Sequence, residues 1–338
     1  MAAGLYLPEQ VPNFGNGQLN PFGLNVTFGP SPLNNIGGVI IDFTSYISPD
    51  TLPLPFINLI GYGPSTTNIT INNVTLINAV ITSVYCDDVS MILNNVSISG
   101  SGSEDLKPIM FAPAVYTPSS VLTINGEFYN NTGFTMISAF NATVKIENSY
   151  IHSNTFTNLL IGFIFTLPGS SITNTTIVNN DMSSLAVQMG SIIEVYQGSS
   201  SLINSTLSGN HGLFSLFHMR LADVSIQETK ITNNSATVSS LIYGSESSLE
   251  MINTTFTSDH LDKDFYFLMF ENSKISLTNV EFNEQSRVVD IIACTSGSIT
   301  LNNVTNNDSG TGLIDCNYPD LCTIQGNQPD ICPNNLLW

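Results

Sequence analysis

The sequence predicts an all-β fold, a right-handed parallel β-helix of about ten to eleven coils with a cap at each end. A pattern of the form apolar-x-apolar-x-Asn-x-x-apolar returns along the chain at steps of 22 to 30 residues. The apolar positions return together with the Asn, so the pattern is a structural repeat and not a bias toward Asn alone. Its apolar residues alternate with period two, which indicates short strands. The central positions are Asn73, Asn95, Asn125, Asn148, Asn174, Asn204, Glu228, Asn253, Asn279 and Asn303.

Other repeat folds fit this pattern less well. No Ala/Glu/Lys-rich run supports helices, whereas β-branched residues flank each Asn. A four-stranded propeller blade needs roughly 40 residues, and leucine-rich repeats require their own Leu and Asn spacing. A coil of about 25 residues with two or three short strands is left, and the chirality of parallel crossovers makes it right-handed.

Two columns of Asn are expected to form ladders along the stack. The central Asn of each repeat is predicted to occupy a corner in the left-handed conformation, which Asn tolerates. Period-two alternation then points its side chain inward, together with its apolar predecessors. A second column, six residues further on, is also predicted to point inward, and consists of Asn131, Asn154, Asn180, Asn210, Asn234 and Asp259.

The domain organisation follows from where the repeat begins and ends. Residues 1–50 are rich in Pro, Gly and Asn and are interpreted as an N-terminal extension or cap. Residues 51–316 form the predicted β-helix, and 317–338 a C-terminal cap that contains Cys and Pro. Caps are expected because an open β-helix exposes a strand edge that invites aggregation.

Composition excludes several classes of function. The formal charge is −19, from 26 acidic and seven basic residues. Such a chain cannot neutralise the phosphates of a nucleic acid, and an anionic lipid surface repels it. No stretch approaches 18 uninterrupted apolar residues, so no membrane span is predicted.

Four of the five cysteines lie in the last 45 residues. This clustering indicates a C-terminal end that is crosslinked by disulfide bonds, in an oxidising compartment. Cys294 and Cys316 lie 22 residues apart in matching contexts, so they are predicted to stack and form a disulfide. Cys322 and Cys332 are then expected to pair within the cap, leaving Cys86 as a free thiol. This pattern predicts an extracellular or cell-surface protein.

Twelve Asn-x-Ser/Thr sequons occur, and several coincide with the central Asn column. An inward orientation shields those Asn from glycosylation, so occupancy is expected at the sequons outside the column. These candidates are Asn25, Asn68, Asn130, Asn141, Asn233 and Asn307.

No catalytic, cofactor or metal site is predicted. A glycosidase needs carboxylates about 5–10 Å apart, yet acids such as Asp87, Asp181 and Asp223 lack acidic partners at matching offsets in neighbouring repeats. The run from Asp259 to Asp264 has oxygens for calcium but lacks EF-hand spacing, and is interpreted as a solvated corner. The four histidines share no ligand spacing and are expected at the surface or at corners. Arg220 and Arg287 are the only arginines.

Residues 69–316 resemble the right-handed β-helix proteins of the pectin-lyase-like superfamily. Three segments are similar to the FxxN repeat of polymorphic outer-membrane adhesins, although the companion GGA[ILV] motif is missing: Phe128-Tyr-Asn-Asn131, Ile177-Val-Asn-Asn180 and Ile231-Thr-Asn-Asn234. Asn-rich extracellular β-helix repeats of slime-mould-like eukaryotes look at least as close. The superfamily also contains pectate lyases, polygalacturonases and phage tailspike glycosidases.

These observations favour a non-catalytic extracellular protein with a structural, adhesion or recognition role. Its expected partners are a protein or glycan at the cell surface, or further copies of the chain stacked end to end or along a face. The alternative is a polysaccharide-active enzyme, either a glycoside hydrolase, a lyase or a tailspike-like depolymerase.

Overall fold

The computed structural model describes thirteen parts of the chain, which together contain every strand discussed below. They are residues 4–6, 25–28, 39–42, 57–60, 68–78, 84–87, 90–100, 110–113, 120–182, 190–288, 290–307, 312–315 and 322–326.

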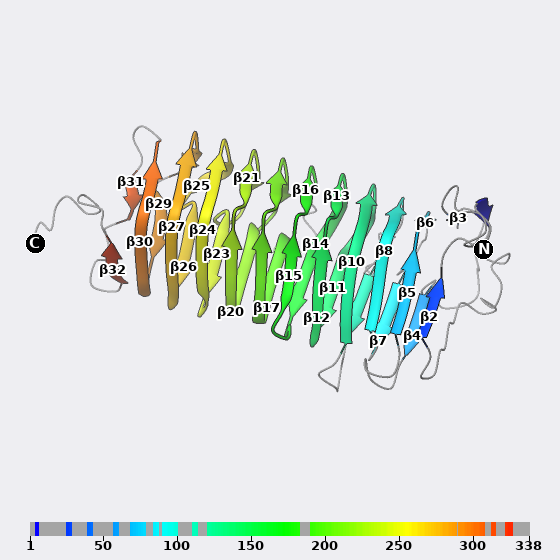
Figure 1. Cartoon of the computed structure of the whole chain (residues 1–338). Helices are drawn as coiled ribbons and strands as arrows, with labels where there is room; N and C mark the ends of the chain where they lie inside the picture. The colour runs from blue at the N-terminus through cyan, green and yellow to red at the C-terminus, as the bar shows by residue number, and fades with distance from the viewer. Residues whose placement is uncertain are drawn as a thin grey trace, which may run out of the picture.

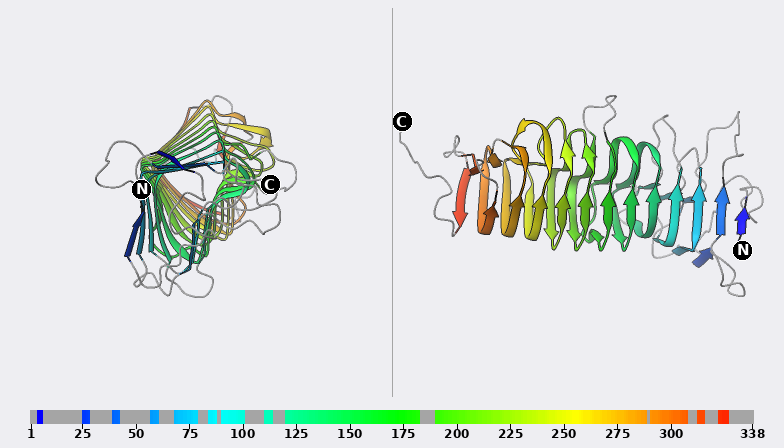
Figure 2. Two further views of the ribbon diagram at one scale, coloured as in Figure 1. Left: turned by 90° about the vertical axis from the view of Figure 1, so that its right-hand side faces the viewer. Right: turned by 90° about the horizontal axis from the view of Figure 1, so that it is seen from above.

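The chain winds into a right-handed parallel β-helix, so the predicted fold class is confirmed. Figure 1 shows successive coils side by side along one axis, and the end-on view in Figure 2 shows the tube that they enclose. About eight turns are complete, fewer than the ten to eleven expected, and partial coils extend the stack at both ends. All strand pairs in the described residues are parallel, as stacking of like strands requires. The described residues contain no helix long and apolar enough to cross a membrane.

The tube has three faces, and several long strands bend around a corner to serve two of them. The first face stacks β2 (Asn25–Phe28), β5 (Asn68–Asn72), β8 (Ser90–Ser99), β10 (Ser120–Tyr129), β12 (Ala142–Glu147), β15 (Ser170–Thr173), β17 (Ser191–Ile203), β20 (Ser215–Gln227), β24 (Ser248–Thr257), β27 (Ser273–Asn283), β30 (Gly297–Asn306) and β32 (Cys322–Gly326).

The second face begins within the segment assigned to the N-terminal cap and uses the C-terminal halves of the long strands. It stacks β1 (Gly4–Tyr6), β3 (Val39–Asp42), β6 (Val74–Ile77), β8, β10, β13 (Tyr150–His152), β16 (Thr176–Val178), β18 (Thr206–Ser208), β21 (Lys230–Thr232), β24, β27 and β30.

The third face uses the N-terminal halves of β17 and β20. It stacks β4 (Ile57–Ile60), β7 (Val84–Asp87), β9 (Met110–Pro113), β11 (Thr132–Phe140), β14 (Thr155–Ile164), β17, β20, β23 (Ile242–Ser245), β26 (Leu268–Glu271), β29 (Asp290–Cys294) and β31 (Gly312–Ile314). A smaller four-stranded ladder precedes it, with β19 (His211–Gly212), β22 (Ser235–Ala236), β25 (His260–Phe265) and β28 (Ser286–Val288).

Residues in the left-handed conformation form three corner columns between the faces. The first corner column, between the third and first faces, contains Asn141, Phe165, Gln197, Leu221, Glu246 and Asn272. The second holds the central Asn of the repeat, such as Asn148 and Asn174, and the third includes Asn130 and Asn233. The predicted left-handed corner is therefore confirmed for the central positions except Asn125, which does not have a positive φ. Asn is frequent in these columns because it tolerates positive φ better than most residues.

The predicted inward orientation of the central Asn is wrong. Asn148, Asn174 and Asn204 are exposed. The side-chain amide of Asn174 donates to Asn148 at 3.3 Å, and that of Asn204 donates to Asn174 at 2.7 Å. A left-handed residue interrupts the period-two alternation of a strand, so two successive side chains point outward at the corner. The next residue, Ser149 in one coil and Thr175 in another, points inward and is buried.

The second predicted column does point inward. Asn131, Asn154, Asn180, Asn210 and Asn234 are at most 1% exposed, and each Nδ2 donates at 2.8–2.9 Å to the side-chain oxygen of the next coil. Each Nδ2 also donates to a backbone carbonyl of the preceding coil, such as Leu207 for Asn234. The column thus satisfies buried polar groups while joining the coils.

Asp259 ends this ladder and is 0% exposed, as predicted for the second column, so the solvated corner expected for the run from Asp259 to Asp264 is wrong at this residue. Its Oδ1 accepts hydrogen bonds from the backbone and side-chain nitrogens of Asn234, at 2.8 and 2.9 Å. Its Oδ2 is buried without a partner. Burial raises the pKa of Asp259 to about 7, although the hydrogen bonds from Asn234 lower it.

Asp259→Asn is expected to stabilise the protein by on the order of 2 kcal/mol at pH 8, because it removes a buried charge and restores a donor. The acid form of Asp259 is favoured by folding, so its contribution is fully present below about pH 4 and is lost as the pH rises to about 7. Chemical denaturation of both proteins between pH 4 and 8 measures this difference. Glu250→Gln, an exposed acid, serves as control. The same pH dependence in Asp259→Asn and the original protein would contradict the expectation.

Candidate active site

A cluster of ionisable side chains lies on the outer side of the third face. Strand register places Glu194, His218 and Tyr243 opposite one another in three successive coils. Two residues further along the strands, Arg220 in β20 and Glu271 in β26 point to the same side by alternation. Here we name these five residues the third-face cluster. The parallel register brings together groups that lie 77 residues apart between Glu194 and Glu271.

Glu194 and His218 form the closest contact of the cluster. His218 Nδ1 lies 3.7 Å from Glu194 Oε1, and their side chains are only 14% and 22% exposed, respectively. Burial lowers the pKa of His218 to about 4, and the Arg220 charge contributes to that decrease. Burial also raises the pKa of Glu194. At neutral pH the imidazole is therefore uncharged, and this contact is not an ion pair.

Tyr243 and the neighbouring rings complete the environment. The Tyr243 hydroxyl donates a hydrogen bond to Glu271, and burial and this carboxylate raise the pKa of Tyr243 to about 12. The Phe214 ring centroid lies 5.1 Å from that of His218 and 5.5 Å from that of Tyr243. Arg220 lies over the ring of Tyr196, 5.6 Å from its centroid, which is a cation–π distance. Two acids, a neutral imidazole, a phenol and a guanidinium thus share a partly buried patch.

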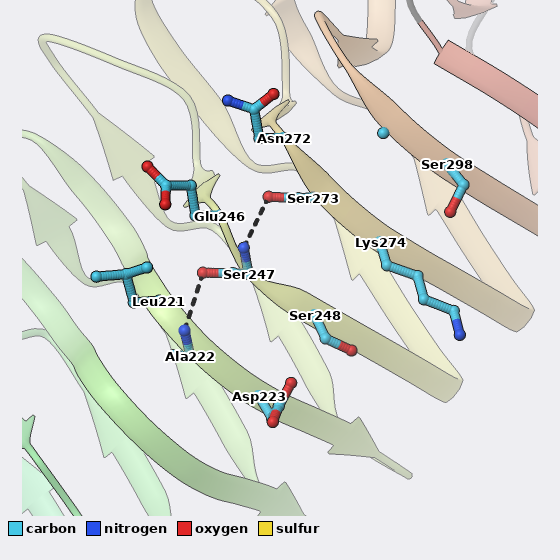
Figure 3. Close-up of a pocket in the computed structure, with 11 residues that line it drawn as sticks. Leu221, Ala222, Asp223, Glu246, Ser247, Ser248, Asn272, Ser273, Lys274 and Ser298 are labelled. Atoms are coloured by element: carbon cyan, nitrogen blue, oxygen red, sulfur yellow. Dashed lines mark hydrogen bonds between the residues drawn. The ribbon is translucent and has the colours of Figure 1, made fainter.

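A polar trough lies across the first corner column from the cluster (Figure 3). It has a volume of about 550 Å³ and is lined by β20, β24, β27 and β30, with Leu221, Glu246 and Asn272 along the corner. Hydrogen bonds from Ala222 N to Ser247 Oγ and from Ser247 N to Ser273 Oγ, at 3.2 and 3.1 Å, tie its floor across three coils. The trough has no member in common with the third-face cluster.

The other histidines occupy structural positions. His152 Nε2 lies 3.2 Å from Glu127 Oε1, and its ring stacks against those of Tyr129 and Tyr150. His211 and His260 contact serine hydroxyls of the next coil, at 2.6 and 2.7 Å. The described residues contain no group of three or more His, Cys, Asp or Glu side chains that could hold a metal ion.

Other acids considered in the sequence lie apart from the cluster. Asp223 lines the trough, and Asp181 forms an isolated backbone bridge between coils. Asp87 is in β7, whereas Asp88 lies outside the described residues. Acids at matching offsets do not reveal the cluster, because its two Glu, Glu194 and Glu271, lie in different columns beside His, Tyr and Arg. Comparing the outward positions of equivalent strands in successive coils, for ionisable residues of any type, would have identified these residues.

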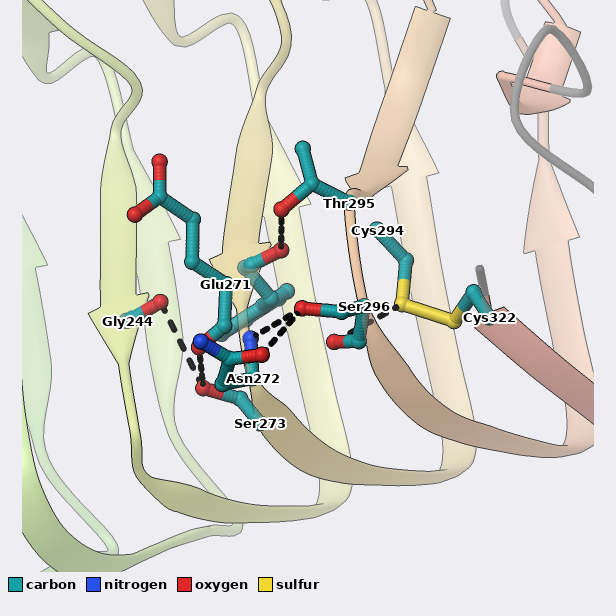
Figure 4. Close-up of a disulfide and its surroundings, with 9 residues drawn as sticks. Gly244, Glu271, Asn272, Ser273, Cys294, Thr295, Ser296 and Cys322 are labelled. Carbon is teal, nitrogen blue, oxygen red and sulfur yellow. Dashed lines mark hydrogen bonds between the residues drawn. A yellow bond between two sulfur atoms is a disulfide. The ribbon is translucent and has the colours of Figure 1, made fainter. Parts of the chain in front are cut away.

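The disulfide pairing predicted from the sequence is wrong. Cys294 is bonded to Cys322, with a Cα–Cα distance of 6.0 Å (Figure 4). Ile292 does stack on Ile314, as the matching contexts indicated. However, the chain turns after β29, and β32 places Cys322 opposite Gly297, three residues beyond Cys294. The proposed Cys322–Cys332 bond is thereby excluded. Cys316 and Cys332 lie outside the described residues.

Glycosylation stays a prediction at each of the six candidate sequons. Asn130 and Asn233 are exposed at left-handed corners, Asn141 is partly buried, and Asn307 is exposed. Asn25 and Asn68 begin strands β2 and β5. Because the central Asn are exposed as well, the shielding that excluded their sequons does not exist.

No family model and no curated protein matches the chain. The A-module of the mannuronan C-5 epimerase AlgE6 from Azotobacter vinelandii matches with a TM-score of 0.40 and 11% identity, over 92% of this chain and 90% of that one. A mannuronic acid-specific polysaccharide family 6 lyase from human gut microbiota gives 0.38 and 9%, over 98% and 92%. The catalytic domain of a GH87 α-1,3-glucanase gives 0.30 and 12%, over 92% and 65%. The likeness extends to the β-helix fold alone.

These solved structures are described as polysaccharide-active enzymes, and none of the three as an adhesion or structural protein. The expectation of a non-catalytic structural or adhesion protein is wrong on this finding.

Arg220→Gln is expected to raise the pKa of His218, since the guanidinium charge is one of its two causes and burial remains the larger. Arg220→Lys retains the positive charge, so the pKa of His218 is expected to stay nearly as low as in the original protein. Imidazole chemical shifts followed by NMR against pH measure both variants, with His152 as internal reference. A His218 pKa that is unchanged in Arg220→Gln would show that the guanidinium does not act on the imidazole.

Cys322→Ser is expected to lower the free energy of unfolding by about 3 kcal/mol, because the bond closes a loop with a sequence separation of 28. Denaturation of Cys322→Ser measures the loss, and peptide mapping without reductant identifies the pair. Cys332→Ser is the matched control and should leave the Cys294–Cys322 bond intact. A crosslink between the Cys294 and Cys316 peptides would contradict the structure.

Proposed function

We propose that the chain is a polysaccharide-active enzyme and that the third-face cluster is its acid–base site. The observation that carries this proposal is the contact of Glu194 with His218, in which burial moves the pKa of each group toward its uncharged form. A carboxyl group with a raised pKa is suited to donate a proton to a glycosidic oxygen. The neutral imidazole beside it has a lone pair that can accept one.

The other members of the cluster suit the same chemistry. Arg220 is a cation next to both His218 and Tyr196, where it can stabilise negative charge that develops on a bound sugar. Tyr243 keeps its proton at neutral pH and holds Glu271 through a hydrogen bond. Tyr196 and Phe214 add ring surface against which the apolar face of a sugar can pack.

The strand register also suits a polymeric substrate. Outward side chains repeat at about 4.8 Å along the axis, so a chain lying parallel to the axis meets a new set of groups in each coil. Phe140, Ile164 and Tyr196 form such a row. Phe165, at the adjacent corner, contacts the rings of Phe140 and Tyr196 edge-to-face, with ring centroids 5.1 and 5.5 Å apart. This row ends at Arg220, so it leads directly to the cluster.

The purified protein is expected to cleave at least one member of a panel of neutral and acidic polysaccharides, detected as new reducing ends or as ultraviolet absorbance from unsaturated ends. Glu194→Gln and His218→Asn should each lower the rate by about 100-fold or more, the usual contribution of a general acid or base.

The second face supplies a matched control. Glu127 and His152 form another His–carboxylate contact, at 3.2 Å, outside the proposed site. Glu127→Gln and His152→Asn should therefore leave the rate within about twofold. Equal losses in the two pairs of variants, or no cleavage of any polysaccharide, would overturn the proposed function.

A further inference from the structure

We infer that the polar trough beside the first corner column is a second glycan-binding site, and that it takes an uncharged glycan segment in preference to a polyuronate. The choice of a glycan as ligand rests on the proposed function, whereas the site itself stands on its own lining residues. The trough lies beyond the first corner column from the third-face cluster and shares no residue with it, so ligand bound there is held outside the groups proposed for catalysis.

Four outward side chains line the trough in register across successive coils. Asp223 in β20 is opposite Ser248 in β24, which is opposite Lys274 in β27 and then Ser298 in β30. None of the four side chains makes a hydrogen bond or ion pair with another described residue. A carboxylate, a hydroxyl, an ammonium group and a second hydroxyl therefore stand at about 4.8 Å intervals with their hydrogen-bonding capacity available.

The floor beneath these groups is held in place by the fold. Ser247 and Ser273 point inward from the neighbouring positions, and their hydroxyls accept backbone hydrogen bonds from the preceding coil. Ser247 Oγ and Ser273 Oγ also donate to carbonyls within their own coils, at 2.7 Å in each case. The outward groups are thus presented by backbone that has little freedom to move, which lowers the ordering cost of binding.

The corner supplies an apolar edge on one side of the trough. Leu221 is 38% exposed and lines the trough, and Phe165, two coils away in the same corner column, is also 38% exposed. They are two of only five large hydrophobic side chains that are exposed among the described residues. A surface that combines an apolar edge with a few convergent polar groups is typical of small-molecule sites.

Charge favours an uncharged ligand. The lining contains two carboxylates, Asp223 and Glu246, and one ammonium group, Lys274, which gives a net charge of −1. The whole chain carries −19, so its field also opposes the approach of a polyanion. Hydroxyl groups of a neutral sugar can both donate to the carboxylates and accept from Lys274, whereas a uronate carboxylate can only accept. A hydroxyl-rich neutral glycan therefore matches the groups that are present.

The test measures binding by the full chain, by calorimetry, in the Glu194→Gln background so that no ligand is consumed. The probes are linear neutral glucan hexasaccharides of α-1,3, α-1,4, β-1,3 and β-1,4 linkage, with hexagalacturonate for comparison. At least one glucan is expected to bind at least tenfold more tightly than hexagalacturonate. The double variant Lys274→Met, Ser298→Ala should lower the affinity for that glucan tenfold or more.

The matched control is Lys230→Met with Ser276→Ala, which removes an exposed lysine of the second face and an outward serine of β27 that lies outside the trough. It should leave the affinity within about twofold. The inference is overturned if no glucan binds, if hexagalacturonate binds more tightly, or if the control weakens binding as much as the trough variant.

The outcomes separate this inference from the proposed function. Glucan binding that depends on Lys274 and Ser298, in a protein that cleaves no polysaccharide, supports the trough and overturns the enzyme. Cleavage that depends on Glu194 and His218, with glucan binding unaffected by the trough variant, supports the enzyme and overturns the trough.

Discussion

The structure depends on a left-handed corner residue followed by an inward polar side chain that hydrogen-bonds to the adjacent coil. At the third corner, Asn130 is followed by buried Asn131, whose amide joins Asn154 at 2.9 Å. At the second, Asn148 is followed by Ser149, whose backbone N–H donates to Thr175 Oγ1 at 3.4 Å. These two corners bend the chain, satisfy backbone groups that a bend would leave unpaired, and fix one coil against the next. The first corner uses this arrangement only in part, since Glu246 is followed by buried Ser247 but Leu221 by buried Ala222.

Fixed register is what gives the outer surface its chemistry. Because every coil repeats the same path, an outward position on one strand continues as a column along the axis. Glu194, His218 and Tyr243 meet in this way although no local motif connects them. The inward-pointing residues between them form the apolar core, with Val195, Met219 and Phe270 fully buried. Such a rigid core supports precise placement of the exposed groups, which a proton-transfer site requires.

The repeat made the fold predictable, since corner and core positions recur at matching offsets throughout the chain. Orientation at the corner was not predictable from alternation, because one left-handed residue such as Asn148 shifts the alternation by one position. The Cys294 partner depended on where the chain turns after β29, which local similarity to Cys316 does not reveal. The third-face cluster was missed because its members are different residue types whose contacts arise only from the stacking register. Their burial, which moves the pKa of His218 and Glu194, is likewise a property of the folded protein.

The central claim is that a polysaccharide is processed on the third face, at Glu194 and His218. The most direct measurement is a crystal structure of the Glu194→Gln variant with an oligosaccharide from a polysaccharide that the protein cleaves. The account predicts a sugar chain that lies along the axis over Tyr196, His218 and Tyr243, with a glycosidic oxygen within hydrogen-bonding distance of the residue 194 side chain. A sugar chain on the second face, with the cluster left unoccupied, would contradict it.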